Sequence, residues 1–413
     1  MKRVTVSLVL LAAVLFTAGC SRGGGAASSG SEGFSGDLSV WHYFENEVER
    51  TGMQKIANEF MGENPNVKVT VTYVPRDELI KQYILGAVSG ELPGIGMMDN
   101  PDHAAYIQLG ICLDVTDKFN AWEENQFYYE GPLNSVKNGG KVYGLPHNSN
   151  CLELFYDVDQ LNAAGVEPPT TWDELLAVCA ALKQKFPTLY PLGFSANNNE
   201  EGTFQFMPFL LSAGAGVDNL ASPEAIKAIA FWKELVDKGY VPRDVISWGQ
   251  GELNSQFMTG NVIMQTNGPW NIPTIKTEAP NKNWKVTLIP RDQKYASVLG
   301  GENFAATTAC DPEIGWAYLS MLCNGKNTAE YCASVGKFSP RSDGSKYSDV
   351  WTTDPILSVF NEGMQYAMPR GPHPRWNEFS GLVSTALQEV LTSAKTPQIA
   401  MRDAQAAAEL IMK

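Results

Sequence analysis

The stretch GKVYGLPHNSNCLELFYDVDQLNAAGVEPPTTWDEL, residues 140–175, combines several structural signals in a short length. Near its end, Thr171 is followed three residues later by Glu174, which is the T-x-x-E spacing of a capping box. In such a box the hydroxyl and the carboxylate bind backbone amides that the first turn of a helix leaves unpaired. Leu175, Val178 and Leu182 then recur at helical spacing. We therefore predict a helix that begins just after Thr171.

The chain on both sides of this stretch alternates between strand and helix patterns. Residues 38–41 predict a short strand, apolar residues over 53–60 recur at helical spacing, and residues 67–73 alternate as a second strand. Two pairs, at 222–223 and 396–397, place a Ser or Thr N-cap before a proline at the first helical position. Together these patterns predict an α/β fold in which helices cover mixed sheets.

The N-terminus predicts export. Lys2 and Arg3 precede an apolar run over residues 4–16, and small residues then lead to Cys20. The run is too short to span a bilayer comfortably, and its order of charged, apolar and small residues is typical of a secretory signal peptide. We assign residues 1–19 to that signal peptide.

Ala18-Gly19-Cys20 resembles the bacterial lipobox, in which the cysteine thiol is acylated and becomes the first residue of the mature chain. Residues 21–36 are mostly Gly, Ser and Ala, a composition that behaves as flexible coil. Residues 20–36 are accordingly expected to be an acylated cysteine and its tether. The expected location is the extracytoplasmic face of the cell membrane, held there by the lipid.

Size and charge limit the classes of partner. The net charge of −14 makes nucleic acid a poor partner. The body from residue 37 onward exceeds what one hydrophobic core usually supports, so two lobes are expected.

Six cysteines follow Cys20, and an exported compartment permits disulfides. Their spacing does not give a pairing, and Cys323 and Cys332, the nearest pair in sequence, are the candidates for a bridge. The six are Cys112, Cys151, Cys179, Cys310, Cys323 and Cys332.

The common catalytic signatures are absent from the sequence. It contains no G-x-S-x-G elbow, no H-E-x-x-H and no C-x-x-C, and its four histidines lie far apart. Gly139-Gly140-Lys141 is followed by Val142, where a phosphate loop has Ser or Thr. We predict no metal, no cofactor and no enzymatic activity, although the paired carboxylates of a glycosidase could still converge in the fold.

From Asp37 onward the chain resembles the family 1 extracellular solute-binding proteins, a sugar-binding group. Several phrases occur in that family's order and spacing, and Gly94 stands where the family usually has Asp. The phrases are FMGENPNVKV (60–69), GELPGI (90–95), the 140–175 stretch, FMTGN (257–261), NGPW (267–270) and the glycine pair 300–301.

The resemblance implies a two-lobed fold of the type II periplasmic-binding-protein kind, with a ligand cleft at the hinge. It implies a first lobe of residues 37–146 plus 290–338 and a second of 147–289 plus 339–413. The chain would cross between the lobes near Pro146, Pro290 and Pro340.

The resemblance also implies how a sugar would be held, because sugars need flat aromatic platforms and short polar side chains. Trp270 matches a position that stacks on sugar in this family, and Trp376 lies where the family supplies a second cleft aromatic. Asn150 matches a position where a carboxylate can stand. The polar candidates, at strand ends and crossings, are Tyr43, Glu45, Asp99, Asn100, Asp102, Asn148, Asn150, Glu302 and Arg341.

The implied function is that of a monomeric binding lipoprotein that delivers a sugar or oligosaccharide to the permease of an ABC importer. Three alternatives stay open. The same fold can bind a polyamine or a glycerol phosphodiester, an exported glycan-active hydrolase could share the export signal, and a binding protein could serve a sensor instead of a transporter.

Overall fold

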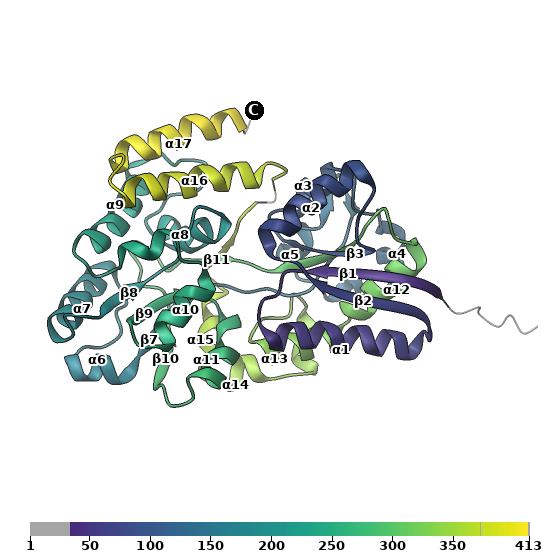
Figure 1. Ribbon diagram of the computed structural model, residues 1–413, viewed down its shortest axis with the longest axis horizontal. Helices are drawn as coiled ribbons and strands as arrows, with labels where there is room; N and C mark the ends of the chain where they lie inside the picture. The colour runs from purple at the N-terminus through teal and green to yellow at the C-terminus, as the bar shows by residue number, and fades with distance from the viewer. Residues whose placement is uncertain (1–33, 372, 412–413) are drawn as a thin grey trace, which may run out of the picture. The chain divides into compact units, whose positions relative to one another are not determined.

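A five-stranded mixed sheet forms the first lobe, and its strands come from three separate parts of the chain (Figure 1). Its order is β2-β1-β3-β12-β6, with β1 parallel to β2 and β3, and β12 antiparallel to β3 and β6. This sheet confirms the predicted strands at 38–41 and 67–73. The strands are β1 (Ser35–His42), β2 (Asn66–Tyr73), β3 (Ile95–Asp99), β6 (Leu145–Pro146) and β12 (Glu302–Ala306).

The second lobe is built on a four-stranded sheet of order β10-β7-β9-β8. Here β7 is antiparallel to both of its neighbours, and β8 runs parallel to β9. The predicted mixed α/β architecture is therefore confirmed in both lobes. The strands are β7 (Glu153–Asp157), β8 (Tyr190–Gly193), β9 (Val262–Asn267) and β10 (Trp284–Thr287).

Helices occur throughout the chain between these strands. Those before β6 are α1 (Glu47–Glu63), α2 (Arg76–Ser89), α3 (His103–Gln108), α4 (Thr116–Ala121) and α5 (Glu130–Asn134). Those between β6 and β12 are α6 (Val158–Ala164), α7 (Trp172–Lys185), α8 (Glu200–Ser212), α9 (Pro223–Asp237), α10 (Gln250–Met258) and α11 (Ile272–Glu278). Those after β12 are α12 (Pro312–Leu322), α13 (Gly325–Val335), α14 (Val350–Thr353), α15 (Leu357–Gly363), α16 (Trp376–Leu391) and α17 (Pro397–Ile411).

Helix starts follow the predicted caps. The Thr171 hydroxyl accepts the Glu174 N–H at 3.2 Å, and Ser222 caps α9 in the same way at 3.1 Å. The Glu174 carboxylate, however, accepts the N–H of Thr170 at 2.8 Å, one residue before the cap. Both side chains of the predicted capping box therefore bind backbone amides, but the carboxylate binds the amide of Thr170 instead of that of Thr171.

Short crossing segments join the two lobes and lie beside one another. The chain leaves the first sheet at Pro146 and enters β7 at Glu153. In between, Ser149 pairs with Phe338 and Asn150 pairs with Gly300, so three distant segments meet. Two further distant segments meet in a two-stranded parallel ribbon, in which β11 (Ser297–Leu299) pairs with β13 (Ala367–Pro369).

The structure, a computed structural model, describes residues 34–371 and 373–411. The predicted signal peptide, Cys20 and most of the predicted tether lie outside these residues. β1 already begins at Ser35, which pairs with Asn66, so the last two residues assigned to the tether belong to the first sheet. No described helix is long and apolar enough to cross a bilayer.

Cys323 and Cys332 do not form the bridge considered above. Both thiols are free and buried, and the Cys332 thiol donates to the backbone oxygens of His147 and Phe338. The other four described cysteines are also free. Five of these six are buried and fill core positions, where cysteine behaves as a small apolar side chain, and Cys310 is partly exposed.

Candidate functional site

A cavity of about 150 Å³ lies between the two lobes, at the carboxyl end of the first sheet. Both lobes and the crossing segments contribute to its wall. Clefts at such strand ends are the usual place for ligands in α/β folds. The wall residues are Tyr43, Phe44, Glu45, Asn46, Glu49, Arg76, Asp99, Asn150, Glu200, Glu201, Phe204, Gln250, Gly251, Trp270, Asn271, Gly300, Gly301, Glu302, Lys337 and Arg370.

Six of the residues predicted from sequence lie in this wall. The chain geometry explains why: β1 and β3 are parallel and end at the same edge of the sheet, and β12 begins opposite the end of β3. Residues just after β1, at the end of β3 and at the start of β12 therefore converge. The six are Tyr43, Glu45, Asp99, Asn150, Trp270 and Glu302.

Trp270 lines the cavity, and the turn Asn267-Gly268-Pro269 that precedes it positions its side chain there. It lies in a short 3-10 helix, Pro269–Asn271, directly after β9, and it is half-buried. Its ring lies over Gly268, where a Cβ atom would come within 1.9 Å of the ring. Phe204 of α8 stacks near it, with ring centroids 6.4 Å apart and planes inclined by 28°. The cavity wall thus has an aromatic surface of two rings.

Three predicted polar residues lie behind the wall. Asn100 accepts a hydrogen bond from Arg370 at 3.3 Å, Asp102 pairs with Arg76 at 2.8 Å, and Asn148 contacts the His147 ring nitrogen at 3.3 Å. All three side chains are buried. None of the three lines the cavity, and Asn100 and Asp102 support the wall residues Arg370 and Arg76.

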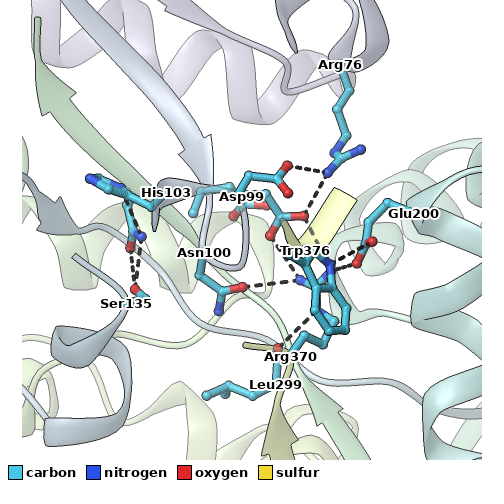
Figure 2. Close-up of polar contacts among 12 residues, drawn as sticks. Arg76, Asp99, Asn100, His103, Ser135, Glu200, Leu299, Arg370 and Trp376 are labelled. Carbon is cyan, nitrogen blue, oxygen red and sulfur yellow. Dashed lines mark hydrogen bonds and ion pairs between the residues drawn. The ribbon is translucent and has the colours of Figure 1, made fainter. Parts of the chain in front are cut away.

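The placement of Trp376 in the cleft is wrong. Trp376 is the first residue of α16, is only 2% exposed and stacks on Phe379 with centroids 5.6 Å apart. Its indole N–H donates to Glu200 Oε2 at 2.9 Å (Figure 2). The ring is a core residue that holds a wall carboxylate from behind.

We expect Trp376→Phe to lower the free energy of unfolding by about 1.5–3 kcal/mol, because the buried Glu200 carboxylate loses a donor while most of the ring volume stays. Urea denaturation measures the change. An unaltered midpoint would show that the indole N–H contributes nothing to stability.

The prediction for Arg341 is also wrong. Its guanidinium is completely buried and binds both oxygens of Asp343, at 3.0 and 2.9 Å, and Glu124 at 2.7 Å. It also lies 4.9 Å from the centre of the Tyr128 ring. This arginine joins the segment after Pro340 to the first lobe, and it is not part of the cavity wall.

Arg370, which sequence reasoning missed, joins the two lobes through buried ion pairs. Figure 2 shows it between Asp99, at the end of β3, and Glu200, at the start of α8. The Arg370–Asp99 distance is 2.9 Å, and the guanidinium lies 4.3 Å above the Phe204 ring. Arg76 contacts Asp99 from the other side at 3.2 Å, which extends the network.

Lys337, also missed, neutralises two further wall acids. Its ammonium lies 2.8 Å from Glu49 and 3.1 Å from Glu302, and 4.3 Å from the centre of the Phe44 ring. The lysine follows α13 and is buried. The cations of the wall are therefore each held by two carboxylates.

Glu45 and Glu201 differ from the other wall acids because neither forms an ion pair within residues 34–371 and 373–411. Burial raises the pKa of Glu45, the nearby Glu49 adds to the effect, and the charge of Arg50 opposes it. Burial also raises the pKa of Glu201, opposed by the Gln250 N–H that its carboxylate accepts at 3.0 Å. The cavity is thus acidic overall.

No His, Cys, Asp and Glu side chains in the described part of the chain gather into a group that could hold a metal ion. The site is therefore a polar cavity with an aromatic surface on one part of its wall.

The sequence matches the family described as bacterial extracellular solute-binding protein over residues 55–359. The chain belongs to this family. The resemblance noted from the sequence phrases is thereby confirmed, and the cavity lies where a binding protein of this fold has its cleft.

Relatives of this solute-binding protein span most of its length. A binding protein of Brucella abortus (strain 2308) is 25% identical over 370 residues, which cover 87% of this chain and 89% of the relative. The sn-glycerol-3-phosphate-binding periplasmic protein UgpB of Escherichia coli O1:K1 / APEC is 24% identical over 419 residues, 88% of this chain and 90% of UgpB.

Among solved structures, an ABC transporter solute-binding protein from Thermotoga lettingae TMO, bound with α-D-tagatose, has a TM-score of 0.85 at 24% identity. It covers 92% of this chain and 100% of its own. The predicted two-lobed fold is therefore confirmed.

Proposed function

We propose that the protein binds a sugar or oligosaccharide in the cavity between the lobes and delivers it to the permease of an ABC importer. The observation that supports this most strongly is the half-buried Trp270, which with Phe204 forms an aromatic surface in a wall that is otherwise polar. A sugar presents apolar C–H faces ringed by hydroxyls, which such a wall complements. The Thermotoga relative of the same fold holds a sugar.

Glycerol phosphate is the second candidate, because UgpB is a relative. The charges of the cavity oppose it. Each wall cation already contacts two carboxylates: Arg76 with Asp99 and Asp102, Lys337 with Glu49 and Glu302, and Arg370 with Asp99 and Glu200. A phosphate would meet a wall with more acids than cations, and like charges at such range are costly.

The test is a thermal-shift screen of the purified full-length chain against mono- and disaccharides, glycerol 3-phosphate and polyamines. A ligand that binds only the folded state raises the melting temperature. We expect a saturable rise with a saccharide. A rise with glycerol 3-phosphate or polyamines alone would overturn the proposed ligand class and leave the family assignment intact.

We further propose that Cys20 is acylated and holds the protein at the extracytoplasmic face of the membrane as a monomer. The lipobox-like Ala18-Gly19-Cys20 supports this proposal. Cys20→Ser should move the protein from the membrane fraction to the soluble fraction of cells. Membrane retention of this variant would contradict lipid anchoring.

We also propose lobe boundaries at residues 146, 290 and 338, with the lobes closing on the ligand. The crossing after Pro146 and the contact of Ser149 with Phe338 support them. Closure would require that the ligand contacts both lobes more fully in the closed state. Small-angle scattering should then show a smaller radius of gyration with ligand than without it.

A further inference from the structure

We propose that the saccharide bound in this cavity carries a protonated amine, and that the carboxylates of Glu45 and Glu201 bind this group. The inference rests on the proposed function and narrows its ligand class to amino sugars.

The two carboxylates come from different lobes and converge at the start of α10. Glu45 follows β1, and its Oε2 lies 3.7 Å from the position of a Cβ atom on Gly251. Glu201 lies in the first turn of α8, and its Oε2 accepts the N–H of Gln250 at 3.0 Å. Because Gln250 and Gly251 are adjacent, the two acids lie close to one another in the cavity wall.

The cations near this pair act on it only at a distance: the charge of Arg50 opposes the rise in the pKa of Glu45, and that of Arg76 opposes the rise in the pKa of Glu201. The cations of the wall are held by other carboxylates, as described above, and Arg50, the closest basic residue to Glu45 in sequence, lies 5.4 Å from the centre of the Tyr73 ring. No ion pair to Glu45 or Glu201 exists within the described ranges. Two carboxylates that share a site without an ion-paired cation repel each other, and a ligand ammonium would reduce that repulsion.

The backbone amides at the start of α10 do not satisfy both carboxylates. Its backbone amides attract negative charge, and the Gln250 N–H is satisfied by Glu201. Glu45 receives no hydrogen bond from the described residues. Glu45 is an exposed residue, so its carboxylate is free to bind a ligand in place of water.

The unpaired hydrogen-bond acceptors of the wall independently indicate a ligand that donates hydrogen bonds. Asn150 is 3% exposed and lines the cavity, and its Oδ1 receives no hydrogen bond in the described part of the chain. With the Glu45 carboxylate it gives the wall two acceptors that a donor on the ligand can satisfy. An ammonium group has three donors and no acceptor.

A saccharide fits better than a simple polyamine because the wall also offers a buried donor that has no partner. Gln250 Nε2 is buried in the wall and has no acceptor within residues 34–371 and 373–411. A sugar hydroxyl or ring oxygen can accept this hydrogen bond, whereas a fully protonated polyamine has no acceptor. Trp270 adds the flat surface on which a sugar ring stacks.

Calorimetry at neutral pH with matched ligands tests the inference. The probes are glucose, galactose and mannose, their 2-amino and N-acetylamino counterparts, and chitobiose with its deacetylated form. We expect the amino member of a binding pair to bind about 10- to 100-fold more tightly than its neutral or acetylated partners, because charge-assisted hydrogen bonds are the strong ones.

The variants Glu45→Gln and Glu201→Gln keep the side-chain shape and remove the charge. Each should reduce the preference for the amine at least about fivefold while the affinity for the neutral partner changes little. Glu47→Gln, an exposed residue in the first turn of α1, is the matched control and should keep the full preference.

The outcomes separate the inference from the proposed function. Binding of neutral saccharides with no preference for their amino counterparts overturns the inference and leaves the proposed function standing. A preference that survives both glutamine variants also overturns it. If no saccharide of either kind binds, the proposed function fails, and this inference fails with it.

Discussion

Arg370→Met is expected to lower the free energy of unfolding by about 3–5 kcal/mol, the usual cost of removing one partner from a buried ion pair. The reason lies in what the substitution leaves behind. Asp99 and Glu200 are both buried, and each contacts the Arg370 guanidinium. Without that cation both carboxylates would stay desolvated and only partly compensated, by Arg76 and by the Trp376 N–H. Urea denaturation measures the loss.

Arg375→Met is the matched control. Arg375 lies five residues away and pairs with Glu378, but this pair is exposed at the start of α16. Arg375 also donates to the backbone oxygens of Leu410 and Ile411, at 3.3 and 3.2 Å. Exposed ion pairs contribute little to stability and a hydrogen bond about 1 kcal/mol, so we expect a much smaller loss than for Arg370→Met. Equal unfolding midpoints for the two variants would contradict the view that Arg370 holds the lobes together in solution.

Trp270→Ala is expected to weaken saccharide binding about 30- to 70-fold. A sugar ring that covers roughly 80–100 Å² of the indole would lose about 2–2.5 kcal/mol at about 25 cal/mol per Å², which corresponds to that factor. Trp270→Phe keeps a flat ring and should lose less. Calorimetry with the saccharide identified by thermal shift gives the dissociation constants.

Trp316→Ala provides the comparison for this variant. Trp316 packs edge to face with Trp122, with centroids 5.8 Å apart, and lies outside the cavity wall. It should lower the unfolding midpoint without changing affinity. If Trp270→Ala binds as tightly as the unaltered protein, the aromatic surface is not where the sugar stacks.

The sequence predicts those parts of the site that depend on local signals. Strand patterns place Tyr43, Glu45 and Asp99 near the ends of β1 and β3, and parallel strands bring those ends together. The turn that follows β9 likewise aims Trp270 at the cavity. In each case a short stretch of chain fixes the direction of the side chain.

The ion pairs were not predictable in this way. Arg370 is 271 residues from Asp99 and 170 from Glu200, and no periodicity or motif relates positions so far apart. Trp376 and Arg341 were misplaced for a related reason. In sequence, a tryptophan buried in the core looks the same as one that faces a cleft, and an arginine in a buried ion pair looks the same as one that faces a ligand. Only the tertiary partners distinguish the two positions.

The order of strands in the first sheet has a consequence for how the chain acquires its structure. β3 is complete at Asp99, but its partner β12 begins only at Glu302. At about 5–20 residues per second, the ribosome needs roughly 10–40 s to make the residues between them. During that interval β3 presents an unpaired edge, and closing so long a loop is intrinsically slow. The first lobe, although it starts the chain, therefore cannot complete its sheet until the ribosome has made β12, which ends at Ala306.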